Sequence, residues 1–277
     1  MAQQQTQPII TLTTDFGSND HLVAAMKGVM LSINPEVRII DVSHHVMPFD
    51  ILDAALILGQ CYKTYPIRTI HVVVVDPGTG TQRRPIMVTG DKHFFIGPDN
   101  GVFSMVYEKE ESFSVREITA SHYFQTPVSN TFHGRDVFAP CAAWLAKNNA
   151  AASFGDQITD FVRFSMPKPK TVNGVLKGTV LKVDNFGNLL TNLTTEDVPQ
   201  LVAGTPFKLN VGGKDIAKVA QTYMQGAPNE PFVISAVSGG GLDTLLGEIY
   251  EQLQEYRKQA GQKGKSVRMP DDEGIRA

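Results

Sequence analysis

The chain has 277 residues and a formal net charge of −3, and 42% of its residues are hydrophobic while 19% are charged. This balance is typical of a globular protein with a hydrophobic core, and the near-neutral charge excludes an overall basic field that would attract nucleic acid. The longest apolar runs are only as long as strands, so we expect no membrane span. The polar, Gln-rich start has no signal-like apolar core, and Cys61 and Cys141 are expected to be free thiols, which together favour a cytoplasmic protein.

Strand and helix signals alternate through the first half of the chain. Apolar and β-branched runs predict strands at 9–13, 37–42 and 69–75, and helical periodicity predicts helices at 19–33, 50–65 and 132–147, the first capped by Asn19. The strand at 69–75 is almost wholly apolar, which is typical of a strand buried on both faces. We therefore expect an α/β domain over 1–164, with a mainly parallel sheet flanked by helices.

The pattern changes after a Pro- and Lys-rich linker at 165–174. Short strands separated by turn signals are predicted at 175–183, 188–193, 206–211, 216–223 and 232–237, which indicates a smaller, barrel-like all-β domain over 175–241. The last part, 242–277, is predicted to hold an amphipathic helix to about residue 258 and then a disordered polar tail.

Charged side chains follow two of the predicted strands directly. Asp15 comes after the first strand and Asp76 after the buried strand, and ligands collect at the carboxyl ends of strands in such sheets. Arg83 follows Asp76 by seven residues across a turn rich in Pro and Gly, so the two can pair either in a site or as a surface ion pair. Asp15 could accept hydrogen bonds from a ribose diol or cap a helix. His133 stands at the start of a predicted helix, where a histidine by itself indicates a cap or a packed core residue.

Motifs for other chemistries are missing from the sequence. It has no GxxxxGK[ST] or GxGxxG phosphate loop, no CxxC or HExxH metal spacing and no GxSxG nucleophile turn. Residues 184–188 by themselves indicate only a hairpin. Composition and spacing thus predict an α/β domain and a β domain with carboxylates at strand ends, without defining a reaction.

Five ordered motifs define a resemblance that covers about residues 8–232. They are TDFGSND (14–20), VDPGTGTQRR (75–84), GPDNG (97–101), FHGRD (132–136) and DNFGNLLTN (184–192). With them the chain resembles the S-adenosyl-L-methionine (SAM) hydrolases, or SAM hydroxide adenosyltransferases, which are related to fluorinases and chlorinases. The resemblance implies hydrolysis of SAM to adenosine and L-methionine, with SAM as substrate, no cofactor and no metal. It also implies a homotrimer or a dimer of trimers, with the substrate between subunits, and no nucleic-acid or membrane partner.

The resemblance also implies roles for individual residues. Asp76, Arg83 and His133 correspond to the catalytic set. Asp15 corresponds to the ribose ligand, Phe49 and Phe186 to residues flanking the nucleoside, and Thr79 and Gly134 to the lining of the nucleophile pocket. The remaining substrate contacts are Asp20 and Asp184 for the methionine ammonium, Asn188 for adenine, and Ser238 and Gly239 for the last part of the ligand site.

Two alternatives follow from the same motifs. A halogenase is disfavoured because the halogenating relatives carry Tyr where this chain has Asp76, and an anionic side chain should repel halide. A non-catalytic SAM- or adenosine-binding module is the second alternative, because residues 234–242 depart from the family's usual ending and look like the end of an Obg-type GTPase domain. A functional GTPase is not expected without a phosphate loop.

Overall fold

The computed structural model describes residues 7–185, 187, 189–194, 196–199, 209–211, 214–216 and 233–234. The chain divides into two compact units, Met1–Ser165 and Met166–Ala277. The predicted helix and tail at 242–277 lie outside the described residues. Among the helices that are described, none combines the length and apolar character that a membrane span requires.

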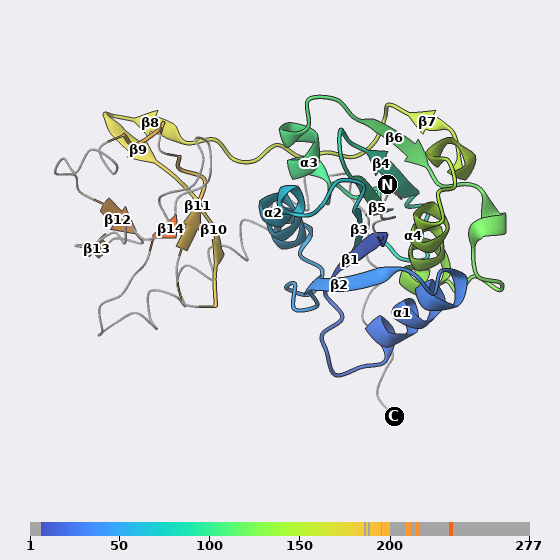
Figure 1. The fold of residues 1–277 in the computed structure, drawn as a ribbon. Helices are drawn as coiled ribbons and strands as arrows, with labels where there is room; N and C mark the ends of the chain where they lie inside the picture. Colours follow the sequence, from blue (N-terminus) through green and yellow to red (C-terminus); the bar gives the residue numbers. More distant parts are fainter. Residues whose placement is uncertain are drawn as a thin grey trace, which may run out of the picture. The chain divides into compact units, whose positions relative to one another are not determined.

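A seven-stranded sheet in the order β2-β1-β3-β5-β4-β6-β7 forms the centre of the first unit (Figure 1). The strands are β1 (Ile9–Thr14), β2 (Arg38–Ser43), β3 (Ile70–Val74), β4 (Pro85–Thr89), β5 (Phe94–Pro98), β6 (Ser114–Glu117) and β7 (Gln157–Ile158). Neighbours from β2 to β5 are parallel, while β4, β6 and β7 continue the sheet in antiparallel pairs. The predicted α/β class with a mainly parallel sheet is confirmed, and β4 to β7 were not predicted as strands.

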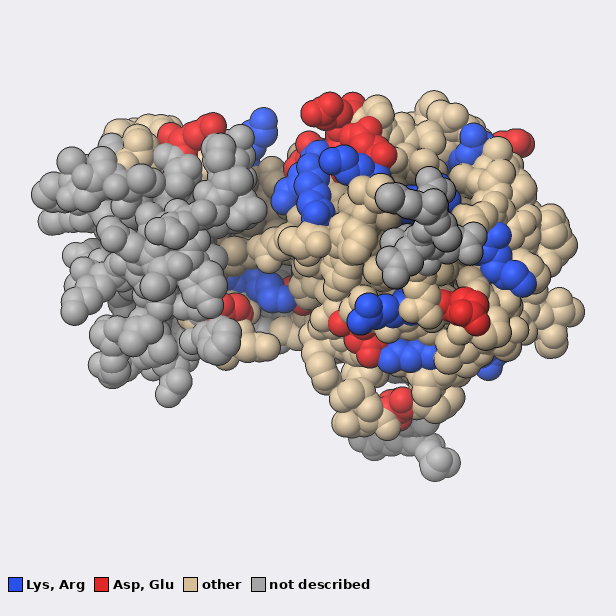
Figure 2. Space-filling view, viewed as in Figure 1, with Lys and Arg blue, Asp and Glu red and all other residues tan. Residues whose placement is uncertain are grey.

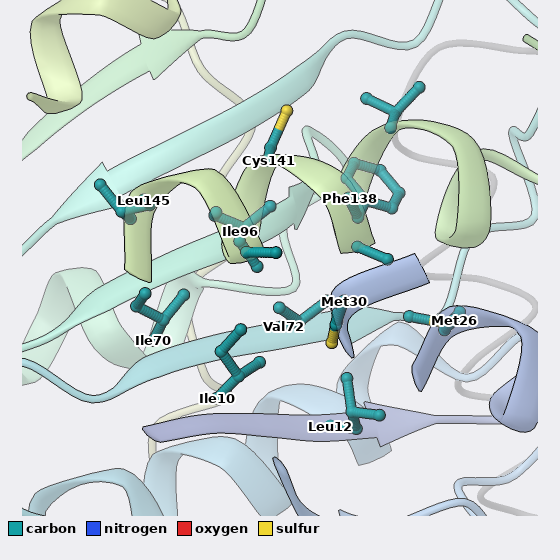
Figure 3. Packing of buried hydrophobic residues seen from close by; sticks show 14 of the residues in the cluster. Ile10, Leu12, Met26, Met30, Ile70, Val72, Ile96, Phe138, Cys141 and Leu145 are labelled. Atoms are coloured by element: carbon teal, nitrogen blue, oxygen red, sulfur yellow. The ribbon is translucent and has the colours of Figure 1, made fainter. Parts of the chain in front are cut away.

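Helices cover both faces of this sheet (Figure 1). They are α1 (Leu22–Ile33), α2 (Ile51–Cys61), α3 (Ser104–Lys109) and α4 (Ala139–Ala146). One core cluster joins the sheet to α1 and α4, and a second joins it to α2 and α3. Figure 3 shows the first cluster, in which strand side chains meet side chains from α1 and α4: Ile10, Leu12, Ile70, Val72 and Ile96 with Met26, Met30, Cys141 and Leu145. All five residues of β3 are buried, as predicted for a strand covered on both faces.

Local details differ from the predicted elements at helix starts. Helix α1 begins at Leu22 with His21 as its N-cap residue, so the prediction that Asn19 caps it is wrong. The predicted helix at 132–147 begins as a π-helix, Gly134–Phe138, and only then continues as α4. Segments of π-helix are rare and are frequently found at functional sites, and sequence periodicity alone does not reveal them.

The described part of the second unit consists of short antiparallel strands. They are β8 (Lys170–Val172), β9 (Val175–Lys177), β10 (Val180–Val183), β11 (Leu189–Thr191), β12 (Leu209–Val211), β13 (Lys214–Ile216) and β14 (Val233–Ile234). Strand β8 lies within the predicted linker and pairs with β9, so residues 170–172 are part of a hairpin. Strands β10 and β11 form the hairpin predicted at 184–188, where Gly187 adopts a positive φ of 82°.

A cluster of aromatic rings fills the space around His71 on β3. The His71 side chain is buried, stacks on Phe95 at 5.3 Å between ring centroids, and has Nδ1 2.8 Å from Thr11 Oγ1. Burial, and secondarily the nearby His93, lower the pKa of His71 from 6.5 to about 3. His71 is therefore neutral in the folded state at every pH at which the protein is expected to work.

This neutral histidine predicts a specific loss of stability in acid. Between pH 6.5 and pH 3 the unfolded chain binds a proton at His71 and the folded chain does not, so the free energy of unfolding must fall as the pH falls. The stabilising contribution of neutral His71 is fully present above pH 6.5. As the pH falls below that value, the free energy of unfolding decreases by about 1.4 kcal/mol per pH unit in the steepest part of the window. Urea unfolding of His71→Gln at several pH values should show a shallower slope than wild type. The matched change His122→Gln, at an exposed side chain, should leave the slope as it is; equal slopes in all three proteins would contradict the assignment.

Candidate active site

Three strands of the sheet bring charged side chains to the same end of the sheet. Asp15 follows β1, Asp76 follows β3, and Arg83 lies shortly before β4, which runs antiparallel to β5. Because β1 and β3 are parallel neighbours, their carboxyl ends emerge side by side. The structure thus brings together Asp15, Asp76 and Arg83 where the strand-end rule places ligand sites.

Asp76 and Arg83 form a buried, two-pronged ion pair. Arg83 Nε donates to Asp76 Oδ1 at 2.9 Å and Arg83 Nη2 donates to Asp76 Oδ2. Only 2% of the Asp76 side chain and 8% of the Arg83 side chain are exposed. The guanidinium also lies over the Phe138 ring, 5.3 Å from its centroid. The alternative of a surface ion pair is therefore wrong, and the guanidinium is fixed in orientation.

Thr79 completes the hydrogen bonding of Asp76. Its hydroxyl lies 2.8 Å from Asp76 Oδ2 and 2.9 Å from the Asp76 carbonyl. The next residue, Gly80, has a φ of +80°, and a Cβ there would lie 2.3 Å from the Asn130 carbonyl oxygen. A side chain at position 80 is excluded on both counts, so the turn that carries Thr79 packs directly against the loop before His133.

His133 also contacts the Arg83 guanidinium, through the same nitrogen that donates to Asp76 Oδ2. Arg83 Nη2 lies 3.3 Å from His133 Nδ1, which makes the imidazole the acceptor, because a guanidinium offers only donors. His133 is the residue immediately before the π-helix, and Gly134 is buried with its Cα facing Val74, Met26 and Phe132 at distances that leave little room for a Cβ. The predicted residues Thr79, His133 and Gly134 thus gather around the ion pair.

Burial and the adjacent guanidinium both keep His133 neutral. Burial is the larger effect and Arg83 the second, and together they lower the pKa of His133 in spite of the nearby Asp76 and Asp136 carboxylates. A neutral imidazole with Nδ1 as acceptor carries its proton on Nε2. His133 can therefore accept a proton at Nδ1 only when Arg83 moves from that lone pair.

Asp15 accepts a backbone hydrogen bond from Phe49 at 2.9 Å. Partial burial raises the pKa of Asp15, and the negative charge of Asp76 adds to that effect, while the Phe49 N–H opposes it. Phe49 itself is 71% exposed and has a positive φ of 64°, a conformation that costs energy in a residue other than glycine. An exposed aromatic ring held this way next to a carboxylate is available to a ligand.

The other predicted contacts come from other parts of the chain. Asp20 is exposed in the segment before α1, and Asp184 lies in the second unit, where its carbonyl accepts from Gly187. Phe186, Asn188, Ser238 and Gly239 lie outside the described residues. In the part of the chain that is described, no three His, Cys, Asp or Glu residues lie together as metal ligands would.

Sequence reasoning missed a carboxylate that organises the loop beside the site. Asp136 is 1% exposed, pairs with Arg135 and accepts the Ser129 N–H at 2.8 Å. It therefore holds the loop whose Asn130 carbonyl packs against Gly80. Asp136 is the last residue of the FHGRD motif, so the motif could have drawn attention to it. Its position directly after Arg135 does not, however, show that its carboxylate is buried.

These features define a class of protein. It is an α/β unit followed by a β unit, with a buried Asp–Arg–His group and a second carboxylate at the strand ends of the first. The chain matches the SAM hydroxide adenosyltransferase N-terminal domain over residues 10–155 and the C-terminal domain of the same family over residues 178–239. The chain belongs to this family, which confirms the membership expected from its motifs.

Individual relatives agree with this assignment. An (R)-S-adenosyl-L-methionine hydrolase of Salinispora arenicola is 38% identical over 86% of this chain and 94% of that protein, and one of Methanocaldococcus jannaschii is 37% identical over 69% and 68%. A fluorinase of Actinoplanes sp. is 29% identical over 74% and 78%. The solved structure of an uncharacterized conserved protein from Thermotoga maritima is 33% identical with a TM-score of 0.75, covering 86% of this chain and 95% of that one.

The position of Arg83 predicts how His133 titrates. Replacing Arg83 by Gln removes the cation that disfavours imidazolium, so the pKa of His133 should rise toward its ordinary value. Histidine NMR titration of wild type and Arg83→Gln measures this. The change Arg68→Gln, at a guanidinium that donates to Asn148 at 3.1 Å, is the matched control and should leave the His133 resonance unaltered. An unmoved or lowered pKa in Arg83→Gln would contradict the contact.

Proposed function

We propose that this chain hydrolyses SAM to adenosine and L-methionine at the Asp76–Arg83–His133 group. The reaction is that of the family to which the chain belongs, and relatives at 35–38% identity are (R)-S-adenosyl-L-methionine hydrolases. The observation that carries the residue assignment is the buried ion pair whose guanidinium also contacts a neutral imidazole. That arrangement binds and polarises a small oxygen nucleophile.

The proposed reaction requires only SAM and water. A water oxygen forms a bond to C5′ of the ribose while the C5′–S bond breaks, and the electron pair of that bond neutralises the sulfonium. The water proton passes to His133 and then to solvent. Positive charge on the leaving group disappears in the process, so methionine departs as a neutral thioether and requires no acid.

Arg83 and His133 have complementary parts in this step. A fixed guanidinium favours the hydroxide-like form of water that develops in the transition state. When water replaces the 3.3 Å Arg83–His133 hydrogen bond, Nδ1 becomes free to take the proton. Asp76 keeps the guanidinium in place through two hydrogen bonds and is itself fixed by Thr79. Asp76 is an orienting group and does not attack.

The substrate contacts extend this proposal to the residues around the group. Asp15 would bind the ribose hydroxyls with the oxygen that Phe49 leaves free, and Phe49 would flank the nucleoside. Thr79 and Gly134 would line the nucleophile pocket, and Asp20, Asp184, Phe186, Asn188, Ser238 and Gly239 would complete the contacts. Ground-state contacts of this kind set affinity more than the rate of the chemical step.

The absence of a cofactor, the partners and the cellular location are proposed as well. We expect no cofactor, metal, nucleic-acid or membrane partner, and a cytoplasmic location. On the visible face of the first unit, Lys and Arg side chains are interspersed with Asp and Glu (Figure 2). Such mixing offers no extended basic surface there among the described residues, which supports the expectation about nucleic acid.

Arg83→Ala tests the proposed function most directly. Removing a donor that acts on charge developing in the transition state should lower kcat by about 10²–10³-fold, whereas the affinity for SAM should change by less than about threefold. Adenosine release is measured by chromatography and affinity by calorimetry, with Arg68→Ala as control. The assay is repeated after EDTA treatment, which should leave wild-type turnover unchanged. Wild-type protein that binds SAM and releases no adenosine would instead be a binding module, and undiminished kcat in Arg83→Ala would remove Arg83 from the site.

The predicted trimer is a separate proposal. Site residues are divided between the two units of the chain, and the family resemblance implies that substrate lies between subunits. Light scattering of the active enzyme should therefore give the mass of three chains or a multiple of three. An active monomer would contradict this.

A further inference from the structure

The GPDNG motif has a place in the structure that the proposed function does not use. Gly97 and Pro98 end β5, and residues 99–101 form the turn that follows. Strand β5 lies between β3 and β4 in the sheet. The segment from Asp76 to Arg83 connects β3 to β4, so it must cross the end of β5, where this turn lies.

The turn contacts the backbone immediately before Asp76. Asn100 Nδ2 donates to the Val75 carbonyl at 2.9 Å, and Asn100 Oδ1 accepts the Val102 N–H at 3.1 Å. Val75 is buried and directly precedes Asp76. The amide of Asn100 thus links the turn to the residue that carries the orienting carboxylate.

The turn also contacts the backbone immediately after Arg83. The Asp99 N–H donates to the Arg84 carbonyl at 2.9 Å, and Arg83 Nη1 donates to the same oxygen at 3.1 Å. The Asp99 carboxylate, only 3% exposed, accepts from Arg84 Nη2 at 2.7 Å and Nε at 3.0 Å. The position of the Arg84 carbonyl therefore determines one of the hydrogen bonds that aim the Arg83 guanidinium.

Close packing prevents the turn from moving on its own. A Cβ on Gly97 would lie 2.6 Å from the Val73 carbonyl oxygen, and Gly101 has a φ of +95° with Phe164 2.9 Å from its Cβ position. The second Asp99 oxygen accepts the Val162 N–H at 2.7 Å. Both ends of the Asp76–Arg83 segment are therefore attached to one rigid element.

We propose that Asn100 and Asp99 are positioning residues for SAM hydrolysis, which fix the two ends of the Asp76–Arg83 segment and so aim the guanidinium at the nucleophile. The inference rests on the proposed function of Asp76 and Arg83. It assigns Asn100 and Asp99 no contact with substrate. Their effect must therefore appear in the chemical step, because misplacing a reacting group by about 1 Å can cost 10²-fold in rate.

Asn100→Ala is the test, with Asn149→Ala as a matched control. Asn149 is also half-buried and also donates its amide to a backbone carbonyl, that of Trp144, at 2.7 Å, but it lies beyond the end of α4 that is remote from His133. Asn100→Ala should lower kcat by about tenfold or more and change KM by less than about threefold. Asn149→Ala should lower the melting temperature comparably and leave kcat unchanged. Asp99→Asn, which keeps the shape but removes the charge that pairs with Arg84, should reproduce the selective loss of kcat.

A combination with Arg83→Lys separates this inference from the proposed function. Lysine keeps the charge but lacks the fork that the Arg84 carbonyl orients, so the effect of Asn100→Ala should shrink from about tenfold to about twofold or less in that background. If Arg83→Ala keeps full activity, the proposed function fails. If Arg83→Ala loses activity while Asn100→Ala and Asp99→Asn behave like Asn149→Ala, or raise KM at constant kcat, only the positioning role fails.

Discussion

A carboxylate and a guanidinium that are buried together lose the hydration that stabilised each of them, and their attraction repays this loss only with good geometry and further hydrogen bonds. This constraint governs the site. Asp76 and Arg83 are almost fully buried and meet through two hydrogen bonds, and Thr79 adds a donor to the carboxylate. The neutral His133 and the Arg84 carbonyl each accept one further hydrogen bond from the guanidinium. Any water that replaces one of these partners enters a fully organised electrostatic environment.

The order of the strands explains how two residues seven positions apart come to face each other. Insertion of β5 between β3 and β4 forces the connecting segment to cross the sheet edge instead of forming a tight hairpin. Asp76 and Arg83 stand at the two sides of that crossing. The parallel neighbour β1 places Asp15 beside them, and the π-helix after His133 presents the imidazole from the covering layer. Three separate segments, each next to a strand or helix, thus contribute to one site.

Sequence could predict the elements whose pattern is local. The apolar strand β3, the Asp50-capped helix α2 and the hairpin before Leu189 follow from periodicity and turn residues. Strands β4 to β7 were not predicted, and the place of β5 between β3 and β4 follows from parallel pairing with β3 and antiparallel pairing with β4. The pairing of Asp76 with Arg83 could be suspected from spacing, but whether it is buried depends on β5 and on Phe138, which are remote in sequence. The family resemblance decided the roles of His133 and Asp15, since each residue type also has a common structural use.

The charges of the site also fit the course of the reaction. Asp76 and Arg83 neutralise each other, so an ionised Asp15, whose carboxylate accepts the Phe49 N–H, leaves one net negative charge at this edge of the sheet. A sulfonium substrate carries the opposite charge and is attracted to that edge. Once the C5′–S bond breaks, neither adenosine nor the thioether sulfur is cationic, and this attraction is lost. The carboxylates therefore attract SAM electrostatically more strongly than they attract either product.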